Sequence, residues 1–205
     1  ALHNAELQGI DPHDEERLTD EIKFKIVEEV IVNPWYYFRE VSRAPGRSGS
    51  EPIKLRANRG NIGLFWSFYN HLTVLLIQPR QTGKSFNTDQ LMTGLMQWHT
   101  KKSDILLLTK DSDLRDRNID RLKAIQKVIP SYLRTNSKKD TDNKESMYNA
   151  VMENTYGTAV GQNSPSNASN AGRGFTVPIM HVDEIAHIKF IEEMLQAASP
   201  ATTEA

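Results

Sequence analysis

The stretch with the clearest chemistry runs from Thr73 to Ser85 and reads TVLLIQPRQTGKS. An apolar, β-rich run leads into a short turn, then Lys84 and Ser85, then a helix-compatible segment. This layout is typical of a phosphate-binding loop, where backbone N–H groups gather at a helix amino terminus and the helix dipole favours anions. Lys84 can reach the β- and γ-phosphates of a nucleotide, and the Ser85 hydroxyl can bind Mg²⁺.

The loop departs from the usual pattern at its start. Gln78 stands where the pattern has Gly, and Pro79 has no N–H to offer a phosphate. We therefore expect the phosphate contacts to come from residues 80–85. A chance Gly-Lys-Ser after a strand is the alternative interpretation of this stretch taken alone.

A second chemical feature is the pair of adjacent carboxylates Asp183 and Glu184, which ends the apolar run Val177–Val182. Side chains alternate along a strand, so neighbouring carboxylates can take different tasks. Asp183 can hold Mg²⁺ through water, and Glu184 can polarise the attacking water. Alone this Walker B pattern is weak. After a phosphate loop it predicts an ATP hydrolase that uses ATP and Mg²⁺.

A parallel sheet would bring these residues to one edge. Short apolar or β-rich runs predict strands over residues 73–77, 104–109, 147–152, 156–160 and 175–182. Apolar residues at helical spacing predict helices over residues 14–32, 58–71, 86–99, 111–129 and 188–198. The expected fold class is α/β: a P-loop NTPase of the RecA-like (ASCE) type, with a mostly parallel sheet and helices on both faces.

Two aromatic groups bear on the core. The cluster Trp35–Phe38 could stack on a base, but large aromatics more often fill a core, and we favour that interpretation. In the helix over residues 58–71, the expected inward stripe is Ile62, Phe65, Trp66 and Tyr69.

Composition bounds the function. The chain has 205 residues, enough for one domain with a core, and a net charge of −1, so any nucleic-acid site must be a local patch. The absence of cysteine excludes disulfides and thiolate metal sites, and the histidines lack paired metal-ligand spacing. No apolar run has membrane-spanning length, and no signal peptide is visible. We expect an intracellular protein, and the start at Ala1 indicates a fragment of a longer one.

From about residue 53 to 195 the sequence resembles the ATPase domain of tailed-phage large terminases, the motors that pump DNA into procapsids. That family commonly lacks the first Gly of the phosphate loop and carries Arg-Gln before x-Gly-Lys-[Ser/Thr], matched here by Arg80-Gln81-Thr82-Gly83-Lys84-Ser85. The strand–helix unit of residues 104–130, the hairpin, the Ser-Pro-containing loop and Asp183-Glu184 follow in the family's order.

The resemblance implies a role for each site residue. The nucleotide would be bound by the loop residues Gln81, Thr82, Gly83, Lys84 and Ser85. Ser85 and Asp183 would support Mg²⁺, and Glu184 would activate water. Arg80 would contact the γ-phosphate within the same subunit. Arg173 lies between two glycines in the long loop of residues 161–174 and matches an arginine that reaches the neighbouring subunit's nucleotide. A loop arginine that binds backbone carbonyls is the alternative for Arg173.

The resemblance also implies partners and a domain plan. Residues 1–52 would be a helical and loop extension packed on the motor, and residues 53–205 a truncated P-loop ATPase core. Partners would be double-stranded DNA bound without base specificity, further copies in a homo-oligomeric ring, the portal protein and the small terminase subunit, in the host cell cytoplasm and without a membrane. The DNA patch would draw on basic residues of 115–127 or on Lys138-Lys139.

Two departures from the family stand out. An aromatic-Gln pair for adenine often precedes the phosphate-loop strand, whereas residues 56–60 read RANRG here. The Ser/Thr-containing stretch of residues 199–203 lies too close to Glu184 for the family's coupling motif. The family's nuclease domain is absent from this sequence, so we expect no DNA cleavage.

Two alternatives to a packaging motor stay open. One is another nucleic-acid-stimulated P-loop ATPase, such as a helicase or remodeller, although such enzymes usually need a second motor domain or further motifs. The other is an assembly module that binds nucleotide without hydrolysing it. Glu184 argues against the second alternative, and a phosphate-release assay separates them.

Overall fold

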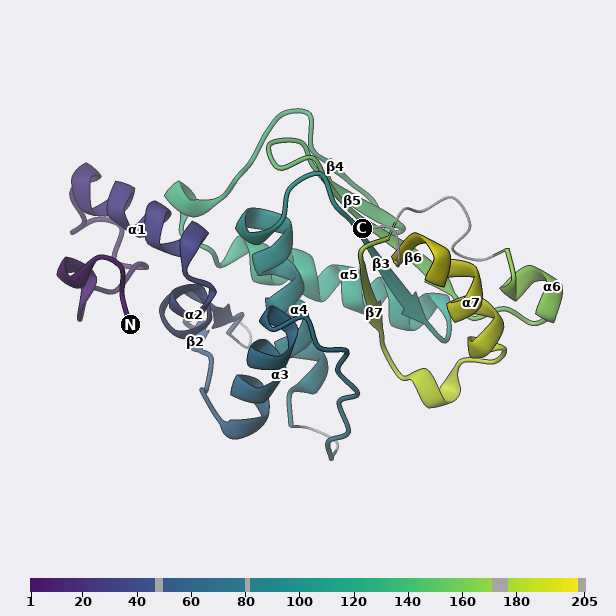
Figure 1. The fold of residues 1–205 in the computed structure, drawn as a ribbon. Coiled ribbons are helices and arrows are strands. Elements are labelled where there is room, and N and C mark those ends of the chain that lie inside the picture. The colour runs from purple at the N-terminus through teal and green to yellow at the C-terminus, as the bar shows by residue number, and fades with distance from the viewer. Residues whose placement is uncertain (47–49, 80–81, 171–176, 203–205) are drawn as a thin grey trace. The chain divides into compact units, whose positions relative to one another are not determined.

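The computed structural model describes residues 1–46, 50–79, 82–170 and 177–202, and Figure 1 shows its elements. The chain divides into two compact units. The first comprises Ala1–His99 and Arg121–Arg134, and the second Thr100–Asp120 and Thr135–Ala205. The predicted division after residue 52 stays a prediction. Within the described ranges, none of the helices combines the length and apolarity that a membrane crossing needs.

The first unit is mainly helical. Its elements are η1 (Ala5–Leu7), α1 (Asp20–Val32), α2 (Pro34–Tyr36), η2 (Tyr37–Val41), β1 (Arg43–Ala44), β2 (Ile53–Lys54), α3 (Arg59–Tyr69), α4 (Lys84–Gly94), η3 (Leu95–His99) and η4 (Ser131–Leu133). Residues 121–127 belong to α5 (Ser112–Lys127), which therefore contributes to both units. β1 and β2 form an antiparallel two-stranded sheet.

The first long helix begins later than the sequence suggested. Residues 15–17 form a turn, and α1 begins at Asp20 because the Thr19 hydroxyl caps it by accepting a hydrogen bond from the Ile22 N–H at 3.3 Å. The predicted end is confirmed, since Asn33-Pro34 stops the helix. The apolar spacing predicted a helix from residue 14, but the cap at Thr19 makes the helix begin at Asp20.

The aromatic cluster fills the core of the first unit, as predicted. Tyr36, Tyr37 and Phe38 are all buried. The Phe38 ring lies 4.3 Å from the Phe65 ring, centroid to centroid, and Tyr37 lies 5.1 Å from Trp98 in the same measure. Tilted aromatic contacts of this kind add to area burial, and they join α3 and η3 to the segment after α1.

The helix predicted over residues 58–71 is α3, capped by the Asn58 side chain, but half of its predicted stripe is wrong. The buried face contains Leu64 and Phe65, whereas Ile62 and Trp66 are exposed. The apolar residues of α3 are spread over more than one face, and only packing decides which of them turn inward.

The strand predicted over residues 73–77 is also wrong. None of the described residues between α3 and α4 is in a strand, and Leu75 and Ile77 are 72% and 84% exposed. An apolar run becomes a strand only where another strand pairs its N–H and C=O groups. Neither sheet of the described chain includes this run.

The second unit is built on a five-stranded sheet of order β4-β5-β6-β3-β7. Its elements are β3 (Asp104–Thr109), the first part of α5, β4 (Thr141–Asp142), β5 (Ser146–Asn149), β6 (Asn154–Val160), α6 (Pro165–Ala168), β7 (Ile179–Val182), η5 (Ile185–His187) and α7 (Ile191–Thr202). β3 runs parallel to both β6 and β7, while β5 pairs antiparallel with β4 and β6. The fold class is α/β, as the sequence predicted.

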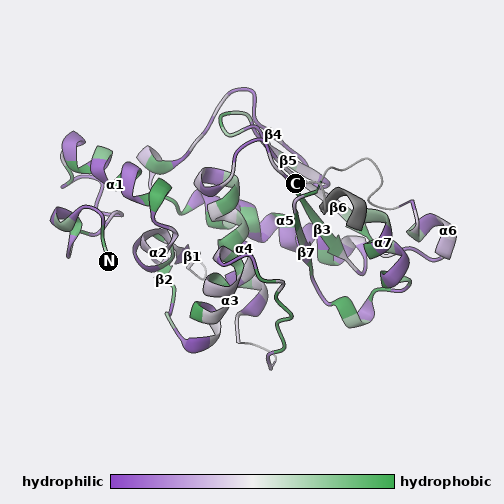
Figure 2. Cartoon of the chain, viewed as in Figure 1, coloured by the Kyte–Doolittle hydropathy of each residue, from purple (hydrophilic) through white to green (hydrophobic). Residues whose placement is uncertain are grey.

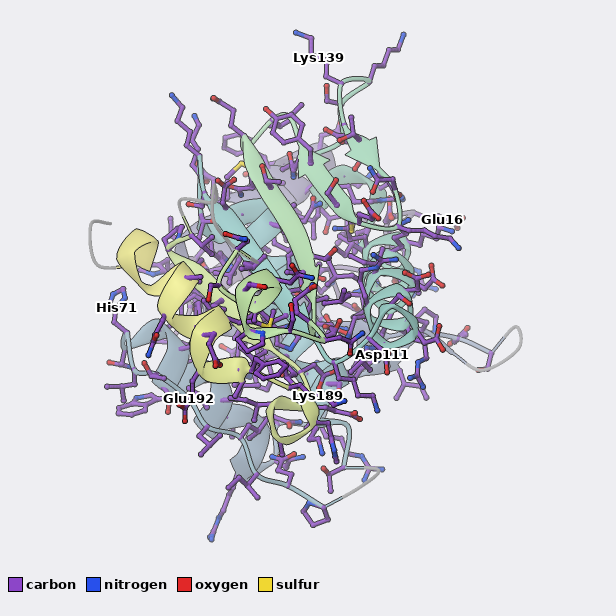
Figure 3. The ribbon with its side chains drawn as sticks, turned by 90° about the vertical axis from the view of Figure 1, so that its right-hand side faces the viewer. Glu16, His71, Asp111, Lys139, Lys189 and Glu192 are labelled. Atoms are coloured by element: carbon purple, nitrogen blue, oxygen red, sulfur yellow. The ribbon has the colours of Figure 1, made fainter. Side chains whose placement is uncertain are left out.

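β3 is the buried centre of this sheet. Its residues from Ile105 to Thr109 are buried, and Figure 2 colours the strand as hydrophobic. Leu106 and Leu108 pack with Met194 of α7 on one face, so Ile105 and Leu107 point to the other face. Figure 3 shows α7 and the α5 end marked by Asp111 on opposite sides of the strands. A strand covered on both faces reads as a continuous apolar run, which is why β3 was predictable.

The first unit contains a histidine that should make stability depend on pH. The Tyr69 hydroxyl lies 2.6 Å from His99 Nδ1, and His99 Nε2 lies 3.0 Å from the Val30 carbonyl oxygen. The carbonyl can only accept, so Nε2 carries the proton and Nδ1 accepts from Tyr69. Burial lowers the pKa of His99 to about 4, although the Val30 hydrogen bond opposes this.

We predict that the free energy of unfolding falls as the pH drops from about 6.5 to about 4. In this window the unfolded chain binds a proton that the folded His99 does not, which costs at most about 1.4 kcal/mol per pH unit. Urea unfolding at several pH values measures the effect. His99→Gln, which keeps a donor and an acceptor, should show a smaller slope than wild type; equal slopes would contradict the assignment.

Candidate functional site

The phosphate-loop sequence folds as a left-handed turn into a helix. Gly83 has φ 79° and ψ 16° and precedes α4, of which Lys84 is the first residue. Only glycine adopts this conformation without strain, so the Gly at this position has a backbone reason. Its carbonyl accepts the first helical hydrogen bond, from the Asn87 N–H at 2.9 Å. The N–H groups of the first turn have no partner within the helix and are available to an anion.

The other loop residues are placed unevenly. Arg80 and Gln81 lie outside the described residues. Thr82 is exposed, and its hydroxyl lies within hydrogen-bond distance of two acceptors, the Pro79 carbonyl oxygen at 2.9 Å and Gln78 Oε1 at 3.1 Å. Lys84 and Ser85 are partly exposed.

The first turn of α4 is tied to α3. The Asn87 side-chain amide donates to Asn61 Oδ1, and the Asn61 amide donates to the Arg56 carbonyl at 2.7 Å. A side chain at Gly60 would lie 2.6 Å from the Gln78 amide nitrogen. The amino end of α3 therefore lies against the start of the phosphate loop. Residues 56–60, which stand where related terminases often have an aromatic-Gln pair for adenine, belong to this region.

Further along α4, buried polar side chains find partners in other segments. Gln90 accepts from the Ser42 hydroxyl at 2.7 Å and donates to the Arg43 carbonyl at 2.7 Å. Its own carbonyl accepts from the Tyr37 hydroxyl at 2.7 Å. Asp89, which is fully buried, pairs with Arg121. These contacts hold the helix that begins at the phosphate loop in one rotation.

In the second unit, Asp183 follows β7 and is buried. Its backbone N–H donates to the Leu108 carbonyl at 3.0 Å, which continues the ladder between β7 and β3. Its Oδ2 accepts a hydrogen bond from the Asn118 amide of α5 at 3.2 Å. The carboxylate is thus fixed at the carboxyl edge of the central parallel strands, the edge where open α/β sheets bind ligands.

Glu184 takes a different environment from its neighbour. Its backbone is left-handed, with φ 57° and ψ 45°, at the start of η5, and its side chain is 39% exposed. The ammonium of Lys110, just past β3, lies 2.9 Å from Glu184 Oε2. The Lys110 hydrogen bond holds the pKa of the Glu184 carboxyl below its ordinary value, with help from the charges of His187 and Arg117, while partial burial opposes the shift.

The donor chemistry fits Mg²⁺. The cation prefers hard oxygen ligands and is usually held by one or two carboxylates together with substrate phosphates. The Asp183 carboxylate of the second unit is an oxygen ligand of this kind, and the joint binding of Mg²⁺ by Asp183 and Ser85 stays a prediction. The described part of the chain holds no cluster of three or more His, Cys, Asp or Glu able to bind a metal.

Sequence reasoning named the loop and the two carboxylates but missed their partners. The sequence offered one indication for Lys110, because this residue directly follows the apolar run predicted to be a buried strand. The pairing of that strand with β7 came only from the structure. The sequence also offered an indication for Asn118, because this residue lies four positions after Leu114 on the predicted inward face of α5. In the structure both side chains are buried. Arg173 lies outside the described residues, so its predicted role stays a prediction.

The fold has a counterpart among solved structures. The crystal structure of the HK97 bacteriophage large terminase superimposes with a TM-score of 0.61 at 12% identity, covering 85% of this chain and 35% of that one. The chain has a terminase-like fold. At this identity the likeness establishes the fold alone, and the matched part is about a third of the terminase. No protein-family profile matches the sequence, and no curated protein matches it.

The ion pair at Glu184 yields a direct prediction. Lys110→Met should raise the pKa of the Glu184 carboxyl toward its ordinary value, because the first cause of the depression is removed. Carbon-13 NMR titration of the side-chain carboxyl, assigned by its loss in Glu184→Gln, measures the shift. Lys102→Met is the matched control, since Lys102 pairs with Glu153 instead. A Glu184 titration identical in wild type and Lys110→Met would exclude this pairing in solution.

Proposed function

We propose that the chain is an ATPase that converts ATP and water to ADP and phosphate. The observation that carries the proposal is the Gly83 turn into α4, which presents Lys84, Ser85 and the free N–H groups of a helix start in the sequence of a phosphate loop. Phosphoryl transfer needs positioned charge more than covalent chemistry, and this turn supplies positioned donors.

The roles follow from the chemistry of each residue and, for Arg80, from the resemblance to large terminases. The N–H groups of residues 81–85 bind phosphate oxygens, and the Lys84 ammonium binds the β- and γ-phosphates. Arg80 binds the γ-phosphate in the same subunit. Ser85 and Asp183 hold Mg²⁺, which when bound neutralises charge on the phosphates. Glu184 accepts a proton from the attacking water. Because the Lys110 ammonium pairs with Oε2 of Glu184, the proton would go to the other carboxylate oxygen, Oε1.

We further propose that the ATPase is a DNA-packaging motor. The terminase-like fold and the Arg-Gln form of the phosphate loop support this. The substrate translocated is then double-stranded DNA, moved into a viral procapsid in the host cytoplasm. The partners are other copies of the chain in a ring, the portal protein and the small terminase subunit. DNA binding would use backbone phosphates without base specificity.

The central test is phosphate release by variants of the two motifs. Lys84→Ala should abolish hydrolysis and weaken ATP binding, because it removes the charge placed for the phosphates. Glu184→Gln should bind ATP nearly normally yet lower kcat by about 10²–10⁴, since only proton transfer is lost. Lys101→Ala removes an exposed lysine outside both motifs and serves as control.

These variants also separate the alternatives. A non-hydrolysing assembly module would bind ATP but release no phosphate even as wild type. Wild-type turnover in Lys84→Ala would exclude the phosphate-loop assignment. Wild-type turnover in Glu184→Gln would show that another group is the base.

The role of Arg173 is tested by mixing subunits. In a head-to-tail ring, Arg173 would reach the neighbouring subunit's γ-phosphate, a contact with a rate effect of roughly 10³ or more. Arg173→Ala and Glu184→Gln should each be slow alone. Under assembling conditions their mixture should recover activity, because some interfaces then pair an intact Arg173 with an intact Glu184. Demonstrated co-assembly without recovery would leave Arg173 acting in cis or only on its own loop.

A further inference from the structure

Asn118 is a polar side chain in an otherwise apolar position. It lies in α5 one turn after Leu114, which is buried, and Asn118 itself is fully buried. A polar amide in such a position costs free energy unless its hydrogen bonds are made. The reason for an amide here, where leucine would fill a similar volume, must lie in what the amide contacts.

One of its contacts is the carboxylate assigned to Mg²⁺. The Asn118 Nδ2 donates to Asp183 Oδ2 at 3.2 Å, and both side chains are buried. A buried carboxylate is costly without a donor, and one that can rotate presents no fixed oxygen to a ligand. The amide satisfies one oxygen and restricts rotation, while the carboxylate keeps lone pairs for a cation or its water.

The two adjacent carboxylates are held by chemically different donors. Glu184 faces the ammonium of Lys110 at 2.9 Å, whereas Asp183 faces a neutral amide. A cation at Asp183 would neutralise the charge that attracts Mg²⁺ and would compete with it. A neutral donor orients the carboxylate without reducing its charge. The type of donor therefore suits a metal ligand at Asp183.

We propose that Asn118 is a positioning residue that orients Asp183 for the Mg²⁺ of Mg–ATP. The inference rests on the proposed function and deepens it. Asn118 acts through Asp183 and touches neither nucleotide nor metal. Outer partners of metal ligands typically contribute 10–100-fold in metal affinity, which sets the size of the expected effect.

The test measures binding rather than turnover. A fluorescent, non-hydrolysable ATP analogue is titrated with wild type and with Asn118→Leu at a series of Mg²⁺ concentrations and in EDTA. The Mg²⁺ concentration for half-maximal enhancement of binding should rise about 10–100-fold in Asn118→Leu. Affinity in EDTA should not change, because the phosphate loop is intact.

Asn154→Leu is the matched control. Asn154 is also fully buried, belongs to the same unit, and donates to the Thr100 carbonyl at 2.9 Å, at the other end of β3. It should alter thermal stability without altering the Mg²⁺ requirement. Should Asn118→Leu fail to fold, Asn118→Ser replaces it, since a serine hydroxyl is too short to reach Asp183 and the same loss is expected.

A double-mutant cycle separates positioning from general packing. In an Asp183→Asn background, Asn118→Leu should add no further change in the Mg²⁺ requirement, because the carboxylate it acts through is gone. An unchanged requirement in Asn118→Leu, an equal change in Asn154→Leu, or additive effects in the cycle would each overturn the inference alone. A wild type whose binding of the analogue ignores Mg²⁺ would overturn the proposed function, and the inference with it.

Discussion

The burial of α4 is the constraint on which the first unit depends. Asn87 and every residue from Asp89 to Trp98 in this helix and its extension η3 are buried, including several polar ones. A buried polar group costs free energy when it lacks a hydrogen-bond partner, so the polar side chains of such a helix favour positions beside other polar groups. Asn87 is matched by Asn61, Asp89 by Arg121, and Gln90 by the segment after α1. The helix that presents the phosphate loop is therefore fixed by the segments around it rather than by its own hydrophobic pattern.

In the second unit the element buried on all sides is a strand, β3, whose backbone hydrogen-bonding groups need partners. β3 is apolar and covered on both faces, and its hydrogen bonds go to β6 and β7. Because β3 and β7 are parallel, the residues that follow them emerge at one edge. This brings Lys110, Asp183 and Glu184 together although more than seventy residues separate Lys110 from the carboxylates. The local chemistry of the site is a consequence of strand direction.

Adjacent residues in the sequence thus acquire opposite surroundings. Asp183 is buried against a neutral amide, while Glu184 turns through a left-handed backbone toward solvent and a lysine. The sequence Asp-Glu after an apolar run does not predict which carboxylate is buried or which side chain each one contacts. These distinct environments are consistent with the different roles proposed for the two carboxylates.

The sequence by itself determined the α/β class, β3 and α4, because apolar runs and the Gly-Lys-Ser spacing are local signals. It misjudged Thr73–Ile77, whose strand character needs a pairing partner, and the rotation of α3, where Trp66 is exposed. Only the tertiary structure decided that Asn118 contacts Asp183 and that Lys110 pairs with Glu184. Such pairings join residues distant along the chain, and strand order and helix rotation select them from many chemically equivalent side chains.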